Sequence, residues 1–551
     1  MDIRRTLIFI GLAISSYFLI LAYNGDYGQK PAPAAQPAVA VQEQAQDVPD
    51  TSDAMQAHTD APNPANPLAV HSVEAKADAS HLIQVVTDTL VVVIDLRGGE
   101  VVSVKLPAYP AAIDQPQTPF SLLDSSNERV YIAQSGLVGR DGIDKNGAAL
   151  FTTSAKNYVL ADGQDELQVV LNASDSKSQV QKIFTFKRAD YLIGVNYKIE
   201  NTSAEPWQGV FYAQLKRDNS SDPSAGSQMG MAAYLGAALT TKENRYAKVK
   251  FSDLEKGYKS VETGGWAAML QHYFLSAWVP QDQTQSYTYN GKVAKGYNIF
   301  GFYGAPLEIA PGSTGELGAN LYVGPKIQKN LEAIAPHLEL TVDYGWLWWI
   351  AQPLFWLLTF FHGLVGNWGL AIILLTISIK ILFFKPSAMS YRSMANMRKV
   401  APKMTAIKEQ YGDNREKLGQ EMMKLYKEEK INPLGGCLPI LIQMPVFIAL
   451  YWVLMESVEL RQAPFYLWIK DMSVMDPYFV LPLIMGVSMF LQMKLNPTPP
   501  DPMQARVMQF MPIIFTVFFL WFPAGLVLYW VVNNVLSIAQ QYVITKQIEK
   551  A

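Results

Sequence analysis

Hydrophobic and polar residues follow different patterns in two parts of this chain of 551 residues. Between residue 81 and about residue 341 the apolar residues come in short runs. Every second residue of Ile193–Glu200 is apolar, which is typical of a strand with one buried face. Many such strands and few helical patterns predict one large antiparallel β-sandwich over residues 81–341.

Two glycine-containing dipeptides lie where hairpin turns are expected. Gly98-Gly99 stands between the strand patterns Thr89–Leu96 and Val101–Leu106, and Asn290-Gly291 follows Tyr287–Tyr289. Glycine and asparagine tolerate the positive φ angles that tight hairpins need. Both dipeptides are therefore predicted to be turns between antiparallel strands.

After residue 362 the apolar residues form blocks that are long enough to cross a bilayer. An earlier apolar run, Leu7–Tyr23, follows two arginines, and no small-residue cleavage site comes directly behind it. Residues 1–23 are therefore interpreted as a retained signal-anchor helix, with cleavage at later Ala-X-Ala-like tripeptides as the alternative. Within a membrane core of residues 362–546, the predicted spans are residues 367–384, 434–460, 478–493, 507–522 and 526–544.

Residues 24–80 differ in composition from both neighbours. They are rich in Ala, Pro and Gln and contain almost no aromatic residues. Such a segment cannot bury enough apolar surface to become ordered. It is predicted to be a disordered linker on the periplasmic side.

Four tryptophans gather in residues 344–361, just before the predicted membrane core. Tryptophan favours the headgroup level of a bilayer, so this segment is predicted to be an amphipathic helix on the outer interface. The alternative is a simple continuation of the next span. Pro353 and Gly363 argue against one unbroken helix.

Basic residues indicate the orientation of the chain in the membrane. Residues 385–430 contain eleven lysines and arginines, whereas Arg461–Pro477 contains two. Because positive residues favour the cytoplasm, the first segment is predicted to be cytoplasmic. Both termini are then cytoplasmic and residues 24–345 are periplasmic.

The basic segment of residues 386–431 carries its own helical pattern. Apolar residues recur at heptad-like spacing on both sides of Gly412-Asp413-Asn414, which predicts a helical hairpin with a kink near Pro402. One interpretation is a solvated hairpin that only satisfies topology. The other is an arm that first meets an incoming partner, through Arg392, Arg398, Lys399 and Lys403.

Lys380 is the residue of the first core span that most needs an explanation. A charge at that depth costs several kcal/mol. Thr376 lies four residues earlier, on the same helical face. In one interpretation the ammonium extends to the cytoplasmic headgroups near Lys385. In the other it faces a wet cavity between helices and receives a negatively charged group.

Other predicted spans carry polar residues on one face. Each alone is more often a hydrogen bond between helices than the wall of a cavity. Glu456 and Glu459 fall near the outer end of their span, so the sequence offers no mid-membrane acid to neutralise Lys380. A buried cation without such a partner needs water or a visiting anion, which favours a groove. The predicted groove residues are Lys380, Thr376, Gln443, Ser488, Gln492, Tyr529 and Asn533.

The composition excludes several other classes of function. The formal net charge of −3 gives no indication of nucleic-acid binding, and the single cysteine, Cys437, forbids an intramolecular disulfide. The sandwich segment shows no metal-ligand spacing, no nucleophile elbow and no phosphate-binding loop. We therefore predict no catalytic residue, no metal site and no cofactor, and a binding or scaffold role for the sandwich.

Four segments carry a family resemblance: NWGLAIILLTISIK, NPLGGCLPILIQMPVFIALY, SVELRQAPF and FTVFFLWFPAGLVLYWVVNN. They resemble the YidC/Oxa/Alb family of membrane protein insertases over about Trp346–Ile544. The N-terminal anchor and the large external domain resemble the Gram-negative form. In that form the external domain is a β-supersandwich related to sugar mutarotase folds, and the protein lies in the inner membrane.

The resemblance implies an insertase and chaperone rather than an enzyme, working alone or with the Sec translocon and its accessory subunits. Five core spans form a groove that is open to cytoplasm and lipid and closed to the outside. Its positive residue attracts the acidic external segment of a nascent membrane protein. We further expect the new apolar helix to slide along a lipid-facing Met and Phe surface, with Met444, Phe447, Met508 and Phe515.

This chain departs from the family pattern at two places. The family's groove charge is usually arginine, and here that position is Lys380, which keeps the charge but loses the bidentate fork. Some relatives carry a long basic C-terminal tail that is associated with ribosome binding. Here the chain stops at Lys546–Ala551, so ribosome binding through a tail is not expected.

Two other classes of function compete with an insertase. A small-solute transporter would show an internal repeat and interrupted spans, and no convincing repeat is present. A tethered sugar-active enzyme would use the external domain. Removal of about Asn24–Val323 would abolish that activity and leave an insertase largely working.

Overall fold

The computed structural model describes residues 79–224, 233–412, 414–429, 438–496 and 502–550. These residues form two compact units that divide between Val342 and Asp343, and each unit is described by itself. The predicted anchor at residues 1–23 lies outside the described residues. So does the predicted linker, apart from its last two residues.

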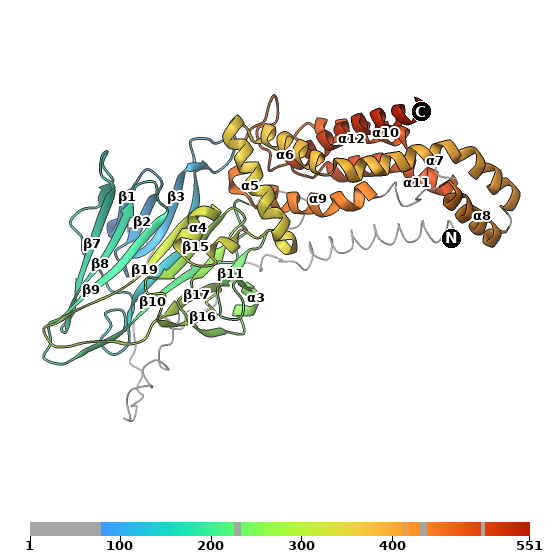
Figure 1. Cartoon of the computed structure of the whole chain (residues 1–551). Coiled ribbons are helices and arrows are strands. Elements are labelled where there is room, and N and C mark those ends of the chain that lie inside the picture. Colours follow the sequence, from blue (N-terminus) through green and yellow to red (C-terminus); the bar gives the residue numbers. More distant parts are fainter. Residues whose placement is uncertain (1–78, 225–232, 413, 430–437, 497–501, 551) are drawn as a thin grey trace. The chain divides into compact units, whose positions relative to one another are not determined.

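The first unit is a two-sheet structure (Figure 1). Within the described residues, an eleven-stranded sheet has the order β13-β16-β17-β10-β5-β4-β3-β2-β1-β6, with β18 paired to β10. Its strands are β1 (Leu82–Val86), β2 (Val91–Asp95), β3 (Glu100–Pro110), β4 (Pro119–Ser125), β5 (Val130–Val138), β6 (Asn157–Val159), β10 (Trp207–Arg217), β13 (Tyr258–Thr263), β16 (Ser286–Ala294), β17 (Tyr297–Tyr303) and β18 (Leu307–Ile309).

The second sheet has eight strands in the order β12-β11-β14-β15-β19-β9-β8-β7. Short helices accompany the sheets: η1 (Ala79–His81), α3 (Phe251–Leu254), α4 (Gln328–Ile334) and η2 (Leu338–Thr341). The strands are β7 (Glu166–Ser174), β8 (Ser178–Lys187), β9 (Leu192–Asn201), β11 (Gly236–Leu239), β12 (Ala247–Val249), β14 (Ala267–Leu270), β15 (Phe274–Pro280) and β19 (Thr314–Pro325).

The two sheets pack through side chains that point inward from their strands. Along β8, buried and more exposed side chains alternate, as the sequence pattern predicts. Trp278 of β15 is buried, and its indole Nε1 donates a hydrogen bond to the carbonyl of Gln214 in β10, at 3.0 Å. A buried indole N–H needs such a partner, and here the partner lies on the opposite sheet. The predicted antiparallel sandwich is confirmed, although β1 and β6 pair in parallel.

One of the two predicted turns is correct and the other is wrong. Gly98 and Gly99, with φ of 74° and 59°, join β2 to the antiparallel β3. Asn290-Gly291 lies inside β16, and the turn to β17 comes at Lys295-Gly296. A Cβ on Gly291 would lie 2.5 Å from Leu254 and 2.8 Å from Phe300, so this glycine permits close packing and not a turn.

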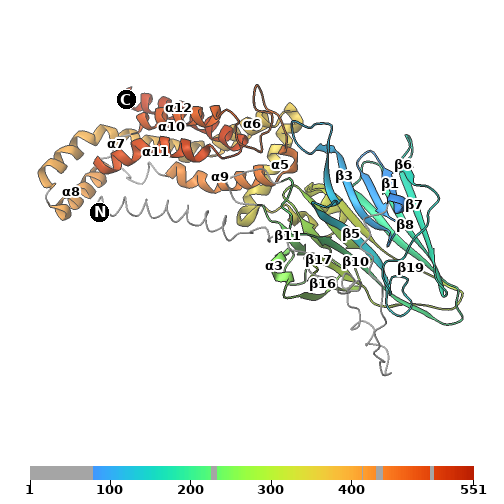
Figure 2. The same ribbon diagram turned by 180° about the vertical axis from the view of Figure 1, so that it is seen from behind.

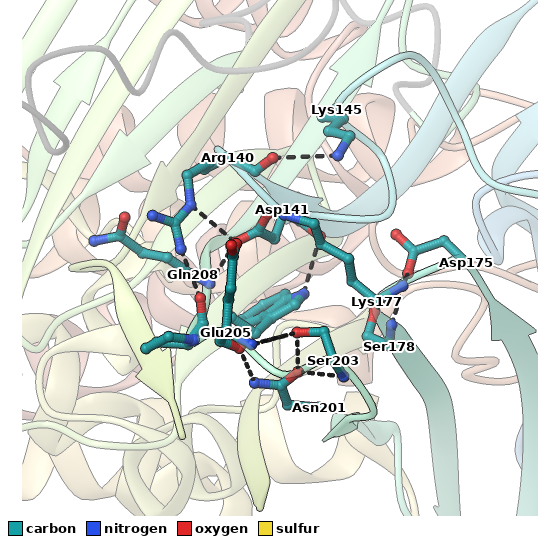
Figure 3. A network of polar contacts seen from close by, with 12 residues as sticks. Arg140, Asp141, Lys145, Asp175, Lys177, Ser178, Asn201, Ser203, Glu205 and Gln208 are labelled. Carbon is teal, nitrogen blue, oxygen red and sulfur yellow. Dashed lines mark hydrogen bonds and ion pairs between the residues drawn. The ribbon is translucent and has the colours of Figure 1, made fainter. Parts of the chain in front are cut away.

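A polar network joins the loop after β5 to β10 and to the turn between β7 and β8 (Figure 3). One carboxylate oxygen of Asp141 accepts from Lys177 Nζ at 2.8 Å. The other accepts from Arg140 Nε and from the backbone N–H of Gln208, both at 3.0 Å. The carbonyl of Asp141 accepts from the indole of Trp207 at 2.9 Å. Each of these polar groups has a hydrogen-bond partner, which indicates a structural role for the cluster.

Lys182 of β8 is a fully buried lysine between the two sheets. Its Nζ donates to the carbonyls of Gly98 and Ser135, each at 3.0 Å, and lies 5.1 Å from the centre of the Tyr197 ring. Burial lowers the pKa of Lys182 from its usual value to about 7, and nearby Asp144 and Glu100 oppose this shift. The sequence pattern gave no indication of this buried amine.

The second unit is helical (Figure 2). Helix α12 lies beside α10 and α6 and also contacts α7 and α9. The elements are η3 (Gly345–Leu347), α5 (Trp348–Val365), α6 (Trp368–Leu382), α7 (Phe384–Tyr411), α8 (Arg415–Glu428), α9 (Leu438–Glu456), η5 (Val458–Leu460), α10 (Val480–Leu495), α11 (Pro502–Phe519) and α12 (Ala524–Lys550).

The boundary between α5 and α6 is set by two residues. Gly366, with φ of 65°, ends α5 in the left-handed conformation that glycine tolerates. The Asn367 side chain then caps α6 by accepting from the backbone N–H of Leu370, at 3.1 Å. The Trp-rich helix is thus separate from α6. Pro353 and Gly363, which were expected to interrupt it, both lie inside α5.

Length and apolar composition identify few complete spans in the described residues. Gly345–Val365 is long and apolar enough to cross a membrane, and α6 with α7 meets the same criterion as a pair bent by 67°. The apolar stretches Ile442–Glu456, Val480–Leu495 and Ala505–Phe519 are shorter. The five core spans therefore stay a prediction.

Helices α7 and α8 pack against each other as a hairpin. Val400 and Met404 of α7 and Leu425 of α8 form a buried cluster. Pro402 lies inside α7. The Asn414 side chain begins α8 by accepting from the backbone N–H of Lys417, at 3.1 Å.

Candidate functional site

Lys380 of α6 is buried and hydrogen-bonded to another helix. Its Nζ donates to the Oγ of Ser537 in α12 at 2.6 Å. The Ser537 hydroxyl donates in turn to the carbonyl of Asn533, one turn earlier in α12, at 2.7 Å. The Lys380 side chain is thus fixed between α6 and α12.

A cavity of about 190 Å³ adjoins this lysine. Its walls are mostly apolar, and the Gln540 amide contributes a polar edge while it donates to the carbonyl of Phe384 at 3.1 Å. Among the described residues, no carboxylate forms an ion pair with Lys380. The cavity is lined by Ile377, Lys380, Ile381, Phe384, Leu536 and Gln540.

Helix α12 also makes polar contacts with α9 and α10. The amide of Asn533 donates to Gln443 Oε1 in α9 at 3.4 Å. The amide of Asn534 donates to Ser488 Oγ in α10 at 3.0 Å. Asn533, Asn534 and Ser537 of α12 thus bond to three different helices. Asn533, Gln443 and Ser488 are groove residues predicted from the sequence, whereas Asn534 was not predicted. The only sequence signal for Asn534 is its adjacency to Asn533.

Two amide atoms of this region have no hydrogen-bond partner in the described part of the chain. They are Nε2 of Gln443 and Oδ1 of Asn533, and both are buried. Buried polar atoms in native proteins nearly always have a partner, so an unpartnered donor and an unpartnered acceptor side by side suit a polar guest. Either water or a peptide group meets this requirement.

Three predicted groove residues are not part of this hydrogen-bond cluster. Thr376 is buried, and its hydroxyl donates to the carbonyl of Ile372 in its own helix, at 2.7 Å. The Tyr529 ring is buried, with its centre 6.4 Å from that of Phe447. Gln492 is partly exposed on α10.

The residues predicted to guide a substrate helix fall into two groups. Phe447 and Phe515 pack on Trp530, with ring centres 4.9 and 6.5 Å away, and so join α9, α11 and α12. Met444 is exposed and Met508 is partly exposed. The most exposed large apolar side chains of α10 and α11 are Leu483, Val487, Leu491, Phe510, Ile513, Ile514 and Val517.

Two of the four basic residues singled out in the hairpin attach it to neighbouring helices. Arg398 donates to the carbonyl of Lys494 at 2.8 Å, and Lys399 donates to that of Ile548 at 2.9 Å. Lys403 pairs with Glu429 at 2.5 Å, and Arg392 is exposed. These contacts give Arg398 and Lys399 a structural role at the hairpin's base.

Comparison with known proteins matches almost the whole chain. The family model "YidC periplasmic domain" matches residues 82–357, and the model "60Kd inner membrane protein" matches residues 360–551. A relative from Azotobacter vinelandii strain DJ, named "Membrane protein insertase YidC", is 56% identical over 100% of this chain and 99% of its own length. One of the same name from Stutzerimonas stutzeri strain A1501 is 54% identical over the same shares.

Solved structures were compared as well. A crystal structure of an active YidC insertase with its first transmembrane domain resolved is 20% identical, covers 84% of this chain and 93% of that one, and has a TM-score of 0.39. A galactose mutarotase related enzyme from Lactobacillus acidophilus is 11% identical, covers 44% of this chain and 97% of its own, and has a TM-score of 0.29.

Proposed function

Because this chain belongs to the YidC family of membrane protein insertases, we propose that it inserts nascent proteins into the bacterial inner membrane through a polar groove that contains Lys380. A polar segment that crosses about 30 Å of hydrocarbon leaves its backbone groups unsatisfied, at several kcal/mol each. Polar groups part-way through the membrane shorten the apolar path. They therefore lower the free-energy barrier to the transfer of the polar segment across the membrane.

The observation that carries this proposal is the burial of Lys380 without an acidic partner among the described residues. Its ammonium is buried against a neutral hydroxyl, and no described carboxylate pairs with it. A buried cation with an anionic partner would have most of its field cancelled. Lys380 keeps its attraction for an acidic segment, and the adjoining cavity gives that segment a place to bind.

The same groove supplies hydrogen bonds for the backbone of the passing segment. Gln443 Nε2 is a donor and Asn533 Oδ1 an acceptor without a partner among the residues that the structure describes. A peptide group carries one of each and pairs with both. This chemistry is indifferent to sequence, as an insertase with many clients requires.

The apolar helix of the client then leaves into lipid along the exposed faces of α10 and α11. Its transfer to hydrocarbon is favourable in itself. The membrane potential pulls an acidic tail outward, at about 2.3 kcal/mol per charge per 100 mV. These two contributions are sufficient to drive insertion without ATP.

The topology and the other partners belong to the same proposal. Both termini and the α7–α8 hairpin lie in the cytoplasm, and residues 24–345 lie in the periplasm. The protein works alone or with the Sec translocon and its accessory subunits. Proteolysis of sealed spheroplasts tests the topology, since periplasmic protease is expected to cut the sandwich and spare the hairpin.

Reconstituted insertion tests the groove. We expect Lys380→Glu to slow insertion of a client with an acidic external tail by at least about tenfold, because attraction becomes repulsion. Lys380→Arg keeps the charge and is expected to remain active. Lys385→Glu, at an exposed lysine five residues away, is the matched control. Normal insertion of every client by Lys380→Ala and Lys380→Glu would refute the groove.

A further inference from the structure

Within the described residues, the Lys380 side chain makes one hydrogen bond, and Ser537 accepts it. Ser537 is buried, and its single proton is directed to the carbonyl of Asn533, at 2.7 Å. A hydroxyl that donates in one direction accepts in another. The hydrogen bonds therefore run from Lys380 to Ser537 to Asn533, and each bond strengthens the next. The hydroxyl of Tyr391 in α7 also bonds to Ser537.

This contact matters because a lysine side chain is long and flexible. Lys380 lies two residues before the end of α6, where Ile381 and Leu382 are 70% and 74% exposed. Without an acceptor inside the helix bundle, the ammonium would extend past these residues toward the headgroups. The bond to Ser537 opposes that movement and keeps the ammonium next to the cavity.

We propose that Ser537 is a positioning residue for substrate capture: its hydroxyl holds the Lys380 ammonium at the wall of the cavity and leaves two of its three N–H groups for the carboxylates of an acidic client segment. This inference rests on the proposed function. An arginine has five donors in a rigid fork, whereas a lysine is a single charge on a flexible chain. A lysine at this position therefore depends on a fixed acceptor.

The test is a double-mutant cycle in proteoliposomes, with two clients that differ only in an acidic or a neutral external tail. Ser537→Ala is expected to slow insertion of the acidic-tailed client by about tenfold, the effect of losing one hydrogen bond to a charged group. The neutral-tailed client is expected to be unaffected. In a Lys380→Ala background, Ser537→Ala is expected to cause no further loss.

Two control variants separate positioning from folding. Ser537→Thr retains the hydroxyl and is expected to insert both clients normally. Ser378→Ala removes a hydroxyl of α6 that, within the described residues, bonds only to the carbonyl of Leu374 in its own helix, and it is expected to have no effect. Equal loss for both clients in Ser537→Ala would indicate a structural role and overturn the inference.

The cycle also separates this inference from the proposed function. If Lys380→Ala inserts the acidic-tailed client normally, the groove cation itself is refuted. If Lys380→Ala is slow while Ser537→Ala is normal, or if the two losses multiply, the groove stands and the positioning role of Ser537 is overturned.

Discussion

Both units of this protein contain buried lysines, and Lys182 of the sandwich and Lys380 of the helical unit have different surroundings. In the sandwich, Lys182 has two carbonyl acceptors, an aromatic ring beside it and acidic groups nearby. In the helical unit, Lys380 has one hydroxyl and an adjoining cavity. The protein itself supplies two acceptors to Lys182, whereas under the proposed function the remaining N–H groups of Lys380 are left for a client segment.

Exchanging each lysine for methionine gives the largest expected contrast. Lys380→Met is expected to slow insertion of an acidic-tailed client by about tenfold or more, because the counter-charge is lost. It is expected to leave the stability of the sandwich unchanged. Lys182→Met is expected to leave insertion per folded molecule unchanged. If Lys182→Met slowed insertion per folded molecule and Lys380→Met did not, the proposed difference between the two lysines would be wrong.

The same Lys182→Met variant is expected to destabilise the sandwich by about 3 kcal/mol, because two carbonyls and the nearby acids lose their buried partner. The measurement is denaturant unfolding of the solubilised full-length protein, with proteolysis of the sandwich as the signal. Lys187→Met, at an exposed position of the same strand, is the control and is expected to change little. An unchanged midpoint for Lys182→Met would show that the buried amine is dispensable.

Stability of the sandwich is expected to depend on pH through Lys182. Its pKa is about 7 in the folded state, against 10.5 ordinarily, so the unfolded chain binds more protons between these values. The free energy of unfolding is therefore expected to rise from about pH 7 to pH 10.5, by at most about 1.4 kcal/mol per pH unit. The comparison is wild type against Lys182→Met at each pH. If the free energy of unfolding rose equally with pH in wild type and in Lys182→Met, groups other than Lys182 would cause the rise.

The smallest expected effect concerns the contact between α12 and α10. Asn534→Ala removes the hydrogen bond to Ser488 Oγ, which is expected to cost about 0.6 kcal/mol, the usual value for such bonds between membrane helices. Thermal unfolding of the helical unit measures it, with Ser488→Ala as the second arm of a cycle.

How well the sequence predicts a local feature depends on whether neighbouring or distant residues decide that feature. The dipeptide Gly98-Gly99 is a turn because its strands are adjacent in sequence. Asn290-Gly291 has the same local signal, but contacts with Leu254 and Phe300 decide its role. The helix break before α6 depends on Gly366 and its cap Asn367, whereas Pro353 is accommodated within α5.

The sequence by itself determined the sandwich, the helical core, the family and the presence of an unusual lysine in an apolar helix. These follow from local periodicity, apolar run length and long matching segments. Tertiary structure alone decided that Ser537 meets that lysine, that Asn534 as well as Asn533 reaches a neighbouring helix, and that Lys182 is buried between the sheets. Each of these contacts joins residues far apart in the chain, so no local pattern encodes it.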